Sequence, residues 1–116
     1  MQDFLIDTML SDGVWVVSLR GEARVEFSDK LVREVARILE EQPADLLLDC
    51  DQLQFLDSAS TGALLKVASQ VRDRDRNMAL FGLSSIVQRV LDVTQLSDCF
   101  PIASNETEAR ALLTEG

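Results

Sequence analysis

The feature that most constrains this sequence is a short uninterrupted apolar run, Leu46-Leu47-Leu48, which follows Pro43 and ends at Asp49. Successive side chains of a strand point to opposite faces, so such a run predicts a strand that is buried on both sides. Burial of this kind is typical of a parallel sheet that helices cover on both faces. We therefore expect the chain to fold around a central strand at 44–49.

The segments around this strand alternate between strand and helix patterns. Runs rich in β-branched, leucine and aromatic residues indicate strands, and apolar residues at helical spacing indicate helices. The expected strands are 4–9, 14–19, 44–49, 77–82 and 100–103, and the expected helices are 28–42, 59–74, 84–94 and a last helix from 104 onward. The alternation predicts one α/β domain spanning 1–116, with a small mixed sheet of about four to five strands packed with about four α-helices.

Several boundaries follow from single residues. Gly21 interrupts the second strand pattern, and Ser28 is a plausible N-cap for the first helix. The segment 51–57 is polar at several positions and is expected to be a connector. Near the C-terminus, Glu108 is spaced to cap back onto Asn105 at the start of the last helix.

Composition excludes several function classes. The chain of 116 residues has 20 acidic and 11 basic residues, a formal charge of −9, and no histidine. The acidic charge argues against nucleic acid and anionic membrane partners, because both need a basic surface. The lack of histidine removes the usual nucleophile–base pairs and most zinc or iron sites. No phosphate-binding glycine motif occurs. We expect no enzyme activity, no metal and no cofactor.

The two cysteines and the N-terminus favour a cytoplasmic protein. Cys50 ends the apolar run and Cys99 precedes Phe100, and neither belongs to a Cys-x-x-Cys pair. Both are expected to be reduced and mostly buried. The N-terminal residues show no signal peptide, and no apolar run approaches the roughly 20 residues that span a membrane.

The most informative segment is 55–62, Phe-Leu-Asp-Ser-Ala-Ser-Thr-Gly. Its hydroxyl residues precede an amphipathic helix, where free backbone N–H groups and the positive end of the helix dipole stabilise an added phosphate. The simpler interpretation is that Asp57 or Ser58 only caps the helix, a common role for a serine in this position.

At these residues the sequence resembles the STAS domain family, the anti-sigma factor antagonists. The family's hallmark is a strand, a short stretch containing Asp-Ser, and then a helix, which Asp57 and Ser58 match. Further similar segments occur in the same order along nearly the whole chain, namely 17–22, 78–83, 86–96 and 108–112. The resemblance implies a STAS-like fold.

The resemblance also implies a partner-switching mechanism. In this family an unphosphorylated antagonist binds an anti-sigma factor, often a serine kinase of the GHKL ATPase type. Phosphorylation of the serine in the Asp-Ser pair ends the binding, and a serine phosphatase resets the switch. Carried over, Ser58 is the phosphorylation site, with Ser60 as second choice. The partner-binding residues are then Arg24, Asp57, Ser58, Ala59, Ser60 and Thr61.

Two departures from the family pattern concern these residues. Arg24 stands where the family usually has an aspartate, so a cation is available there for phosphorylated Ser58 or for an acidic partner. Ser60 stands where the family often has glycine. The alternative function is that of a non-phosphorylated STAS subunit of a lipid or anion transporter, bound to an ATPase subunit. A monomer is the simplest expectation for either function.

Overall fold

The computed structural model describes residues 4–115, which form a five-stranded sheet and four α-helices. The strands are β1 (Phe4–Ser11), β2 (Val14–Ala23), β3 (Asp45–Leu56), β4 (Met78–Phe81) and β5 (Ile102–Ala103). The helices are α1 (Val25–Glu41), α2 (Ser58–Arg72), α3 (Ser85–Val93) and α4 (Glu106–Glu115), and a short 3₁₀ turn spans Ser97–Cys99. The sheet order is β1-β2-β3-β4-β5, with β1 antiparallel to β2 and the other neighbours parallel. The expected mixed α/β fold is confirmed.

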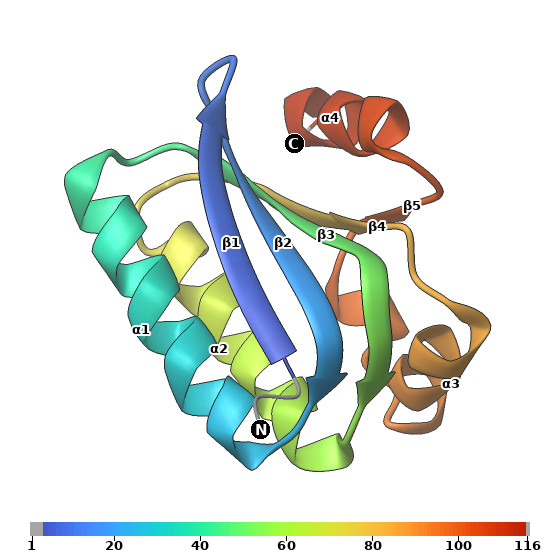
Figure 1. Cartoon of the computed structure of the whole chain (residues 1–116). Coiled ribbons are helices and arrows are strands. Elements are labelled where there is room, and N and C mark those ends of the chain that lie inside the picture. Colours follow the sequence, from blue (N-terminus) through green and yellow to red (C-terminus); the bar gives the residue numbers. More distant parts are fainter. Residues whose placement is uncertain (1–3, 116) are drawn as a thin grey trace.

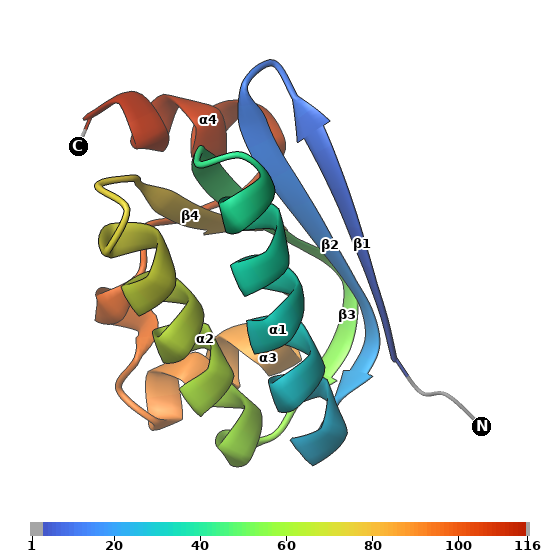
Figure 2. The same ribbon diagram turned by 90° about the vertical axis from the view of Figure 1, so that its left-hand side faces the viewer.

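The leucine run of β3 divides the core into two layers. Leu46 and Leu48 pack into the larger cluster, which also contains buried residues of α1, α2 and α3. Leu47 points to the other face and packs against Ala109 and Leu113 of α4. Figures 1 and 2 show α1 and α2 running side by side, with α4 standing apart from them at one end of the sheet. The strand is therefore buried on both sides, as the sequence predicts.

Helix α1 begins earlier than expected. Its N-cap is Arg24 rather than Ser28, and the cap makes no side-chain hydrogen bond. Phe27 is fully buried, which holds the first turn of α1 against the sheet. Ser28 therefore lies inside the helix, where its hydroxyl is buried without a hydrogen-bond partner. Burial of an aromatic side chain outweighs the local preference of serine for a cap.

Strands β2 and β3 are both longer than expected. Gly21 does not end β2, because it adopts a φ of 92° at an irregularity and the strand continues to Ala23. The residues 51–57 are not a simple connector, since β3 extends to Leu56. Pairing between the two strands resumes after register shifts and joins Gly21 to Leu53 and Ala23 to Leu56. The glycine admits a left-handed conformation that other residues rarely adopt.

The other elements follow the sequence with small shifts. Ser84 caps α3, as its hydroxyl accepts a hydrogen bond from the Val87 amide at 3.2 Å. At the start of α4, the Glu108 amide donates to Asn105 Oδ1, and the Glu108 carboxylate accepts from the Ser104 amide. Within residues 4–115, no helix has the length and hydrophobicity needed to cross a membrane.

Candidate functional site

The segment singled out in the sequence lies at the edge of the sheet where β2 and β3 end. The Asp57 amide donates a hydrogen bond of 3.1 Å to the Ala23 carbonyl, which ties the two strand ends together. Helix α1 starts after Ala23 and the N-cap Arg24, and α2 starts directly after Asp57. Figure 1 shows both helices beginning at this same end of the molecule. The topology therefore brings two helix N-termini to one edge.

Asp57 is the N-cap of α2. Its Oδ1 accepts a hydrogen bond of 2.7 Å from the Ser60 amide, in the geometry preferred by a capping carboxylate. The negative charge also lies at the positive end of the helix dipole. Thr61 donates its hydroxyl to the Ser58 carbonyl within the same turn. Asp57 thus fixes the backbone from which the Ser58 side chain projects.

The predicted contact residues do not all reach the surface. Arg24, Ser58 and Ala59 are exposed, and Asp57 is half-buried. Ser60 and Thr61, by contrast, are 0% and 5% exposed, because they lie on the side of α2 that packs on the sheet. Both side chains are therefore buried in the folded protein, whereas the other four residues of the predicted contact surface are at least partly exposed. The Ser60 hydroxyl also has no hydrogen-bond partner among the described residues.

Arg24 is held beside this edge by two contacts. Its Nη2 forms an ion pair of 2.7 Å with Glu22 Oε1. Its guanidinium carbon lies 4.8 Å from the centroid of the Phe55 ring, a cation–π arrangement. The positive charge is thus placed over the end of β3, next to the residues that lead into Ser58.

Sequence reasoning missed two features near Ser58. Val25 is 68% exposed, an unusual state for a large apolar side chain, and it lies at the first position of α1. A cavity of about 170 Å³ lies between α1 and α2, and Ala59, Gly62, Arg33 and Lys66 are among its lining residues. The exposure of Val25 depends on where α1 starts, which the sequence placed three residues too late, and the cavity depends on how α1 and α2 pack together.

Comparison with known proteins agrees with this arrangement. The family model for the STAS domain matches residues 6–109. This chain belongs to the STAS domain family.

Related proteins carry names consistent with that membership. The anti-sigma F factor antagonist of Paenibacillus polymyxa is 29% identical over 98 residues, covering 84% of each chain. A solved putative anti-sigma factor antagonist from Thermotoga maritima superposes with a TM-score of 0.85 at 20% identity, covering 94% of each chain. The anti-sigma factor antagonist SpoIIAA in its unphosphorylated form gives a TM-score of 0.77 at 18% identity, covering 97% of each chain. Bacillus SpoIIAA in its phosphorylated form gives 0.67 at 16% identity, covering 94% of this chain and 98% of that one.

A pair of carboxylates lies on the sheet of this STAS domain, away from Ser58. Asp49 Oδ1 accepts from the Asp51 amide at 3.0 Å, and Asp49 Oδ2 accepts from the Ser18 hydroxyl at 3.2 Å. Burial and the charge of Asp49 raise the pKa of Asp51. Among the described residues, no group of three or more potential ligands could hold a metal ion.

The two cysteines differ in environment. Cys50 is buried, as expected. Its burial, and to a lesser degree the nearby charges of Asp49 and Asp51, raise the pKa of its thiol to about 12. Cys99 is exposed, which corrects the expectation that both thiols are mostly buried. It lies at the end of a short 3₁₀ turn, where only the following Phe100 enters the core.

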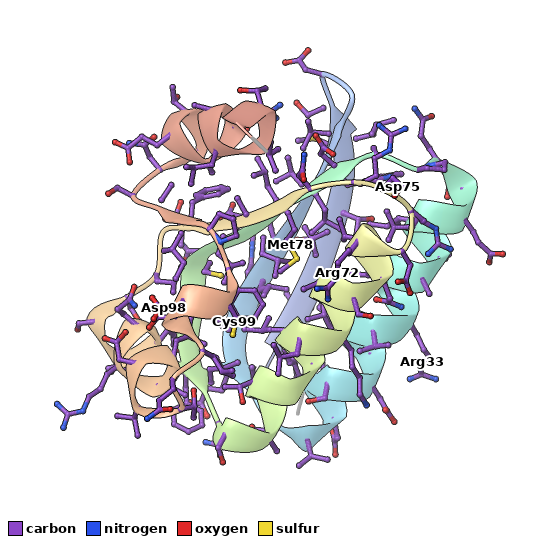
Figure 3. All side chains as sticks on the ribbon, turned by 180° about the vertical axis from the view of Figure 1, so that it is seen from behind. Arg33, Arg72, Asp75, Met78, Asp98 and Cys99 are labelled. Carbon is purple, nitrogen blue, oxygen red and sulfur yellow. The ribbon has the colours of Figure 1, made fainter. Side chains whose placement is uncertain are left out.

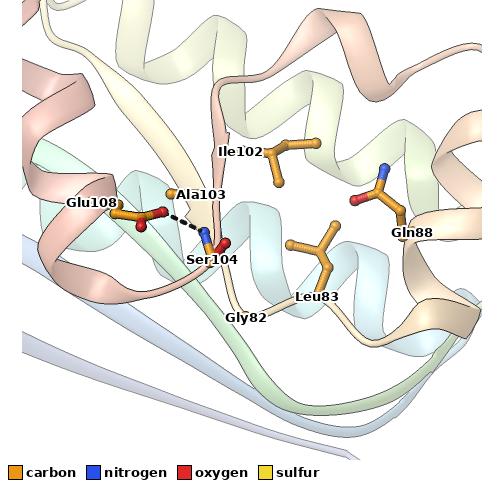
Figure 4. A pocket seen from close by; sticks show the side chains of 7 residues that line it. All are labelled: Gly82, Leu83, Gln88, Ile102, Ala103, Ser104 and Glu108. Carbon is orange, nitrogen blue, oxygen red and sulfur yellow. Dashed lines mark hydrogen bonds between the residues drawn. The ribbon is translucent and has the colours of Figure 1, made fainter.

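A hollow of about 360 Å³ lies where β4 and β5 end (Figure 4). Leu83 and Ile102 supply apolar side chains to it, and Gln88 faces them from α3. Its one charged lining residue, Glu108, already accepts a hydrogen bond from the Ser104 amide at 3.2 Å. The Glu108 carboxylate is therefore already used to cap α4 at the wall of the hollow.

Proposed function

We propose that this STAS domain, a single domain spanning residues 1–116, is an anti-sigma factor antagonist that works by partner switching. The unphosphorylated form binds an anti-sigma factor that is also a serine kinase of the GHKL type. Phosphorylation of Ser58 releases that partner, and a serine phosphatase restores binding. The observation that carries the proposal is the exposed hydroxyl of Ser58 at the first position of α2, directly after the capping carboxylate of Asp57.

The electrostatics of this position explain how a phosphate would act as a switch. A phosphoserine adds roughly −1.5 to −2 charge at neutral pH. At Ser58 this charge would stand next to the Asp57 carboxylate, which already satisfies the Ser60 amide. In a closed interface, like-charge repulsion and the cost of removing water from the phosphate oppose contact. Binding is therefore lost while the fold is retained.

Burial favours Ser58 over the second candidate, Ser60. A kinase must reach the hydroxyl oxygen, and the Ser60 side chain is 0% exposed. Its phosphorylation would require α2 to leave the sheet, because a phosphate has no room in a packed core. Ser58 needs no such opening.

The contact surface is the edge formed by the starts of α1 and α2. It combines Arg24, Asp57, Ser58 and Ala59 with the exposed apolar side chain of Val25. An exposed apolar side chain combined with polar groups is typical of a protein–protein contact. We expect the protein to act as a cytoplasmic monomer that binds without catalysing a reaction.

The alternative, a non-phosphorylated subunit of a transporter, has less support. The related proteins compared above are named as anti-sigma factor antagonists, and one of them has been solved with and without its phosphate.

The test is a set of Ser58 variants titrated calorimetrically against the GHKL-type kinases of the native host, each purified separately. We expect Ser58→Ala to bind one of them as the parent protein does. Ser58→Asp should bind at least about tenfold more weakly, because its charge stands where the phosphate would. Circular dichroism of each variant confirms that the fold is unchanged.

Ser58→Asn is the matched control, since it has nearly the shape of aspartate without the charge. Near-normal binding by Ser58→Asn assigns the loss in Ser58→Asp to charge rather than to size. Tight binding by Ser58→Asp would remove Ser58 as the switch. If none of the kinases binds the parent protein, while a transporter ATPase subunit does, the alternative function replaces this one.

A further inference from the structure

The far end of α2 carries a second feature, remote from Ser58. Helix α2 ends at Arg72, and the chain turns back through Asp75, which adopts a φ of 56°. The turn is closed by hydrogen bonds from the Asp75 amide to the Arg72 carbonyl at 2.9 Å and from the Arg76 amide to the Val71 carbonyl at 3.1 Å. This geometry returns Arg76 to the end of the helix that also carries Arg72.

A cavity of about 230 Å³ opens between this helix end and the segment that leads into β5. Figure 3 shows Arg72, Met78 and Cys99 around it, from three separate parts of the chain. The inner lining is apolar and buried, while the arginines and the thiol are exposed. The residues that matter here are Val71, Arg72, Arg76, Met78, Cys99 and Phe100.

The two arginines have no counterion within the described part of the chain. Neither guanidinium makes an ion pair or a hydrogen bond with any residue of 4–115. Asp73 and Asp75 are close to the arginines in sequence, and Asp98 precedes Cys99, but none of the three lines the cavity. In a protein with a net charge of −9, a pair of unpaired cations over an apolar floor favours an anion with an apolar body.

We propose that this cavity binds a small aromatic carboxylate. An engineered cavity of about 150 Å³ accommodates benzene, so a larger one has room for one ring and a carboxylate. The ring would contact Met78 and Phe100, a sulfur and an aromatic group that both pair well with aromatic rings. The carboxylate would lie at the rim, where the planar guanidinium of Arg72 or Arg76 can bind both oxygens.

The rate at which the exposed Cys99 thiol is alkylated gives a direct measure of ligand binding in the cavity. Iodoacetamide, a neutral reagent, should alkylate Cys99 and leave the buried Cys50 unmodified. Benzoate in the cavity covers the Cys99 sulfur, so we expect it to slow alkylation in a saturable way. A ligand of roughly nine non-hydrogen atoms at so open a site should show a dissociation constant on the order of 1 mM.

Two control ligands and two variants separate the parts of the proposal. Benzamide has the ring without the charge, and acetate has the charge without the ring, so each should protect Cys99 far less than benzoate. Arg72→Gln and Arg76→Gln should each weaken protection by benzoate by about fivefold to tenfold. Each variant is compared with itself in the absence of ligand, since removing a cation also changes the reactivity of the thiol.

Three outcomes would overturn the proposal. Benzoate that fails to slow alkylation up to its solubility limit shows that the cavity does not hold the ligand. If benzamide protects Cys99 as well as benzoate does, the arginines do not contribute to binding. If acetate protects it equally well, the site binds any anion and does not recognise the ring. None of these results depends on Ser58, so the proposal stands or falls separately from the partner switch.

Discussion

The Asp57 carboxylate has a structural task that is separate from signalling. It caps α2 through the Ser60 amide and so holds Ser58 in an exposed position. We predict that Asp57→Ala lowers the free energy of unfolding by about 1 kcal/mol, a typical value for a lost N-cap. Asp57→Asn keeps an acceptor oxygen and should cost much less. Urea denaturation of the two variants measures the difference, and equal losses would show that the cap hydrogen bond is not what stabilises the helix start.

Two glycines offer a matched pair of substitutions. Gly82 adopts a φ of 76°, and a Cβ there would collide with the Asp51 carboxylate. Gly62 lies inside α2, where a Cβ would meet nothing within 4 Å. We predict that Gly82→Ala is destabilising by about 1–3 kcal/mol, whereas Gly62→Ala is stabilising by about 0.5–1 kcal/mol. Thermal unfolding of both proteins tests this, and a destabilised Gly62→Ala would contradict the open environment assigned to that position.

At the element scale, the central strand could be predicted and its full length could not. The run Leu46-Leu47-Leu48 is apolar on both faces, so its burial follows from the sequence alone. Residues 51–56 pair with β2 only after register shifts around Gly21, and such long-range pairing leaves little local signal. The same limit applies to α1, whose start is set by the burial of Phe27 in the distant sheet.

The candidate site was predictable in part for a similar reason. Asp57 and Ser58 form a local motif at a helix start, so sequence alone could place them. The burial of Ser60 and Thr61 depends on how α2 is rotated against the sheet, which neighbouring hydroxyls do not indicate. Val25 could not be recognised as a surface residue before the start of α1 was known.

Helix α4 is the only described helix that covers the second face of the sheet, and Leu113 is its deepest anchor toward the C-terminus. We predict that Leu113→Ala lowers the free energy of unfolding by about 2–3 kcal/mol through lost burial and a residual cavity. Thr114→Ala, an exposed neighbour in the same helix, is the control and should change stability by less than about 0.5 kcal/mol. Similar effects from the two changes in chemical denaturation would mean that α4 is not firmly packed.

At the scale of the whole molecule, the charge is unevenly distributed. The segments 25–41 and 58–76, which contain α1 and α2, hold seven acidic and seven basic residues. The rest of the chain holds thirteen acidic and four basic residues, and so accounts for the entire net charge of −9. A phosphate on Ser58 would therefore turn a region of zero net charge negative, so its relative effect on a partner is large.

The buried thiol of Cys50 predicts how stability depends on alkaline pH. Its pKa is raised from 9.0 to about 12 in the folded protein, so the unfolded chain loses this proton first as the pH rises. The contribution of this buried, protonated thiol to the free energy of unfolding is fully present below pH 9 and is lost between pH 9 and about 12. The expected decline is at most about 1.4 kcal/mol per pH unit. Urea denaturation across this range should show a smaller decline for Cys50→Ala, and identical slopes would contradict the buried, protonated thiol.

The central claim is that Ser58 is the phosphorylated residue of a partner switch. Peptide mass spectrometry of the protein purified from its native host, under several growth and stress conditions, tests it most directly. We predict a single phosphate on the peptide spanning 55–66, localised to Ser58 and varying in occupancy between conditions. A phosphate on Ser60 or Thr61 would contradict the assignment of the site, and a peptide that is never phosphorylated would contradict the switch itself.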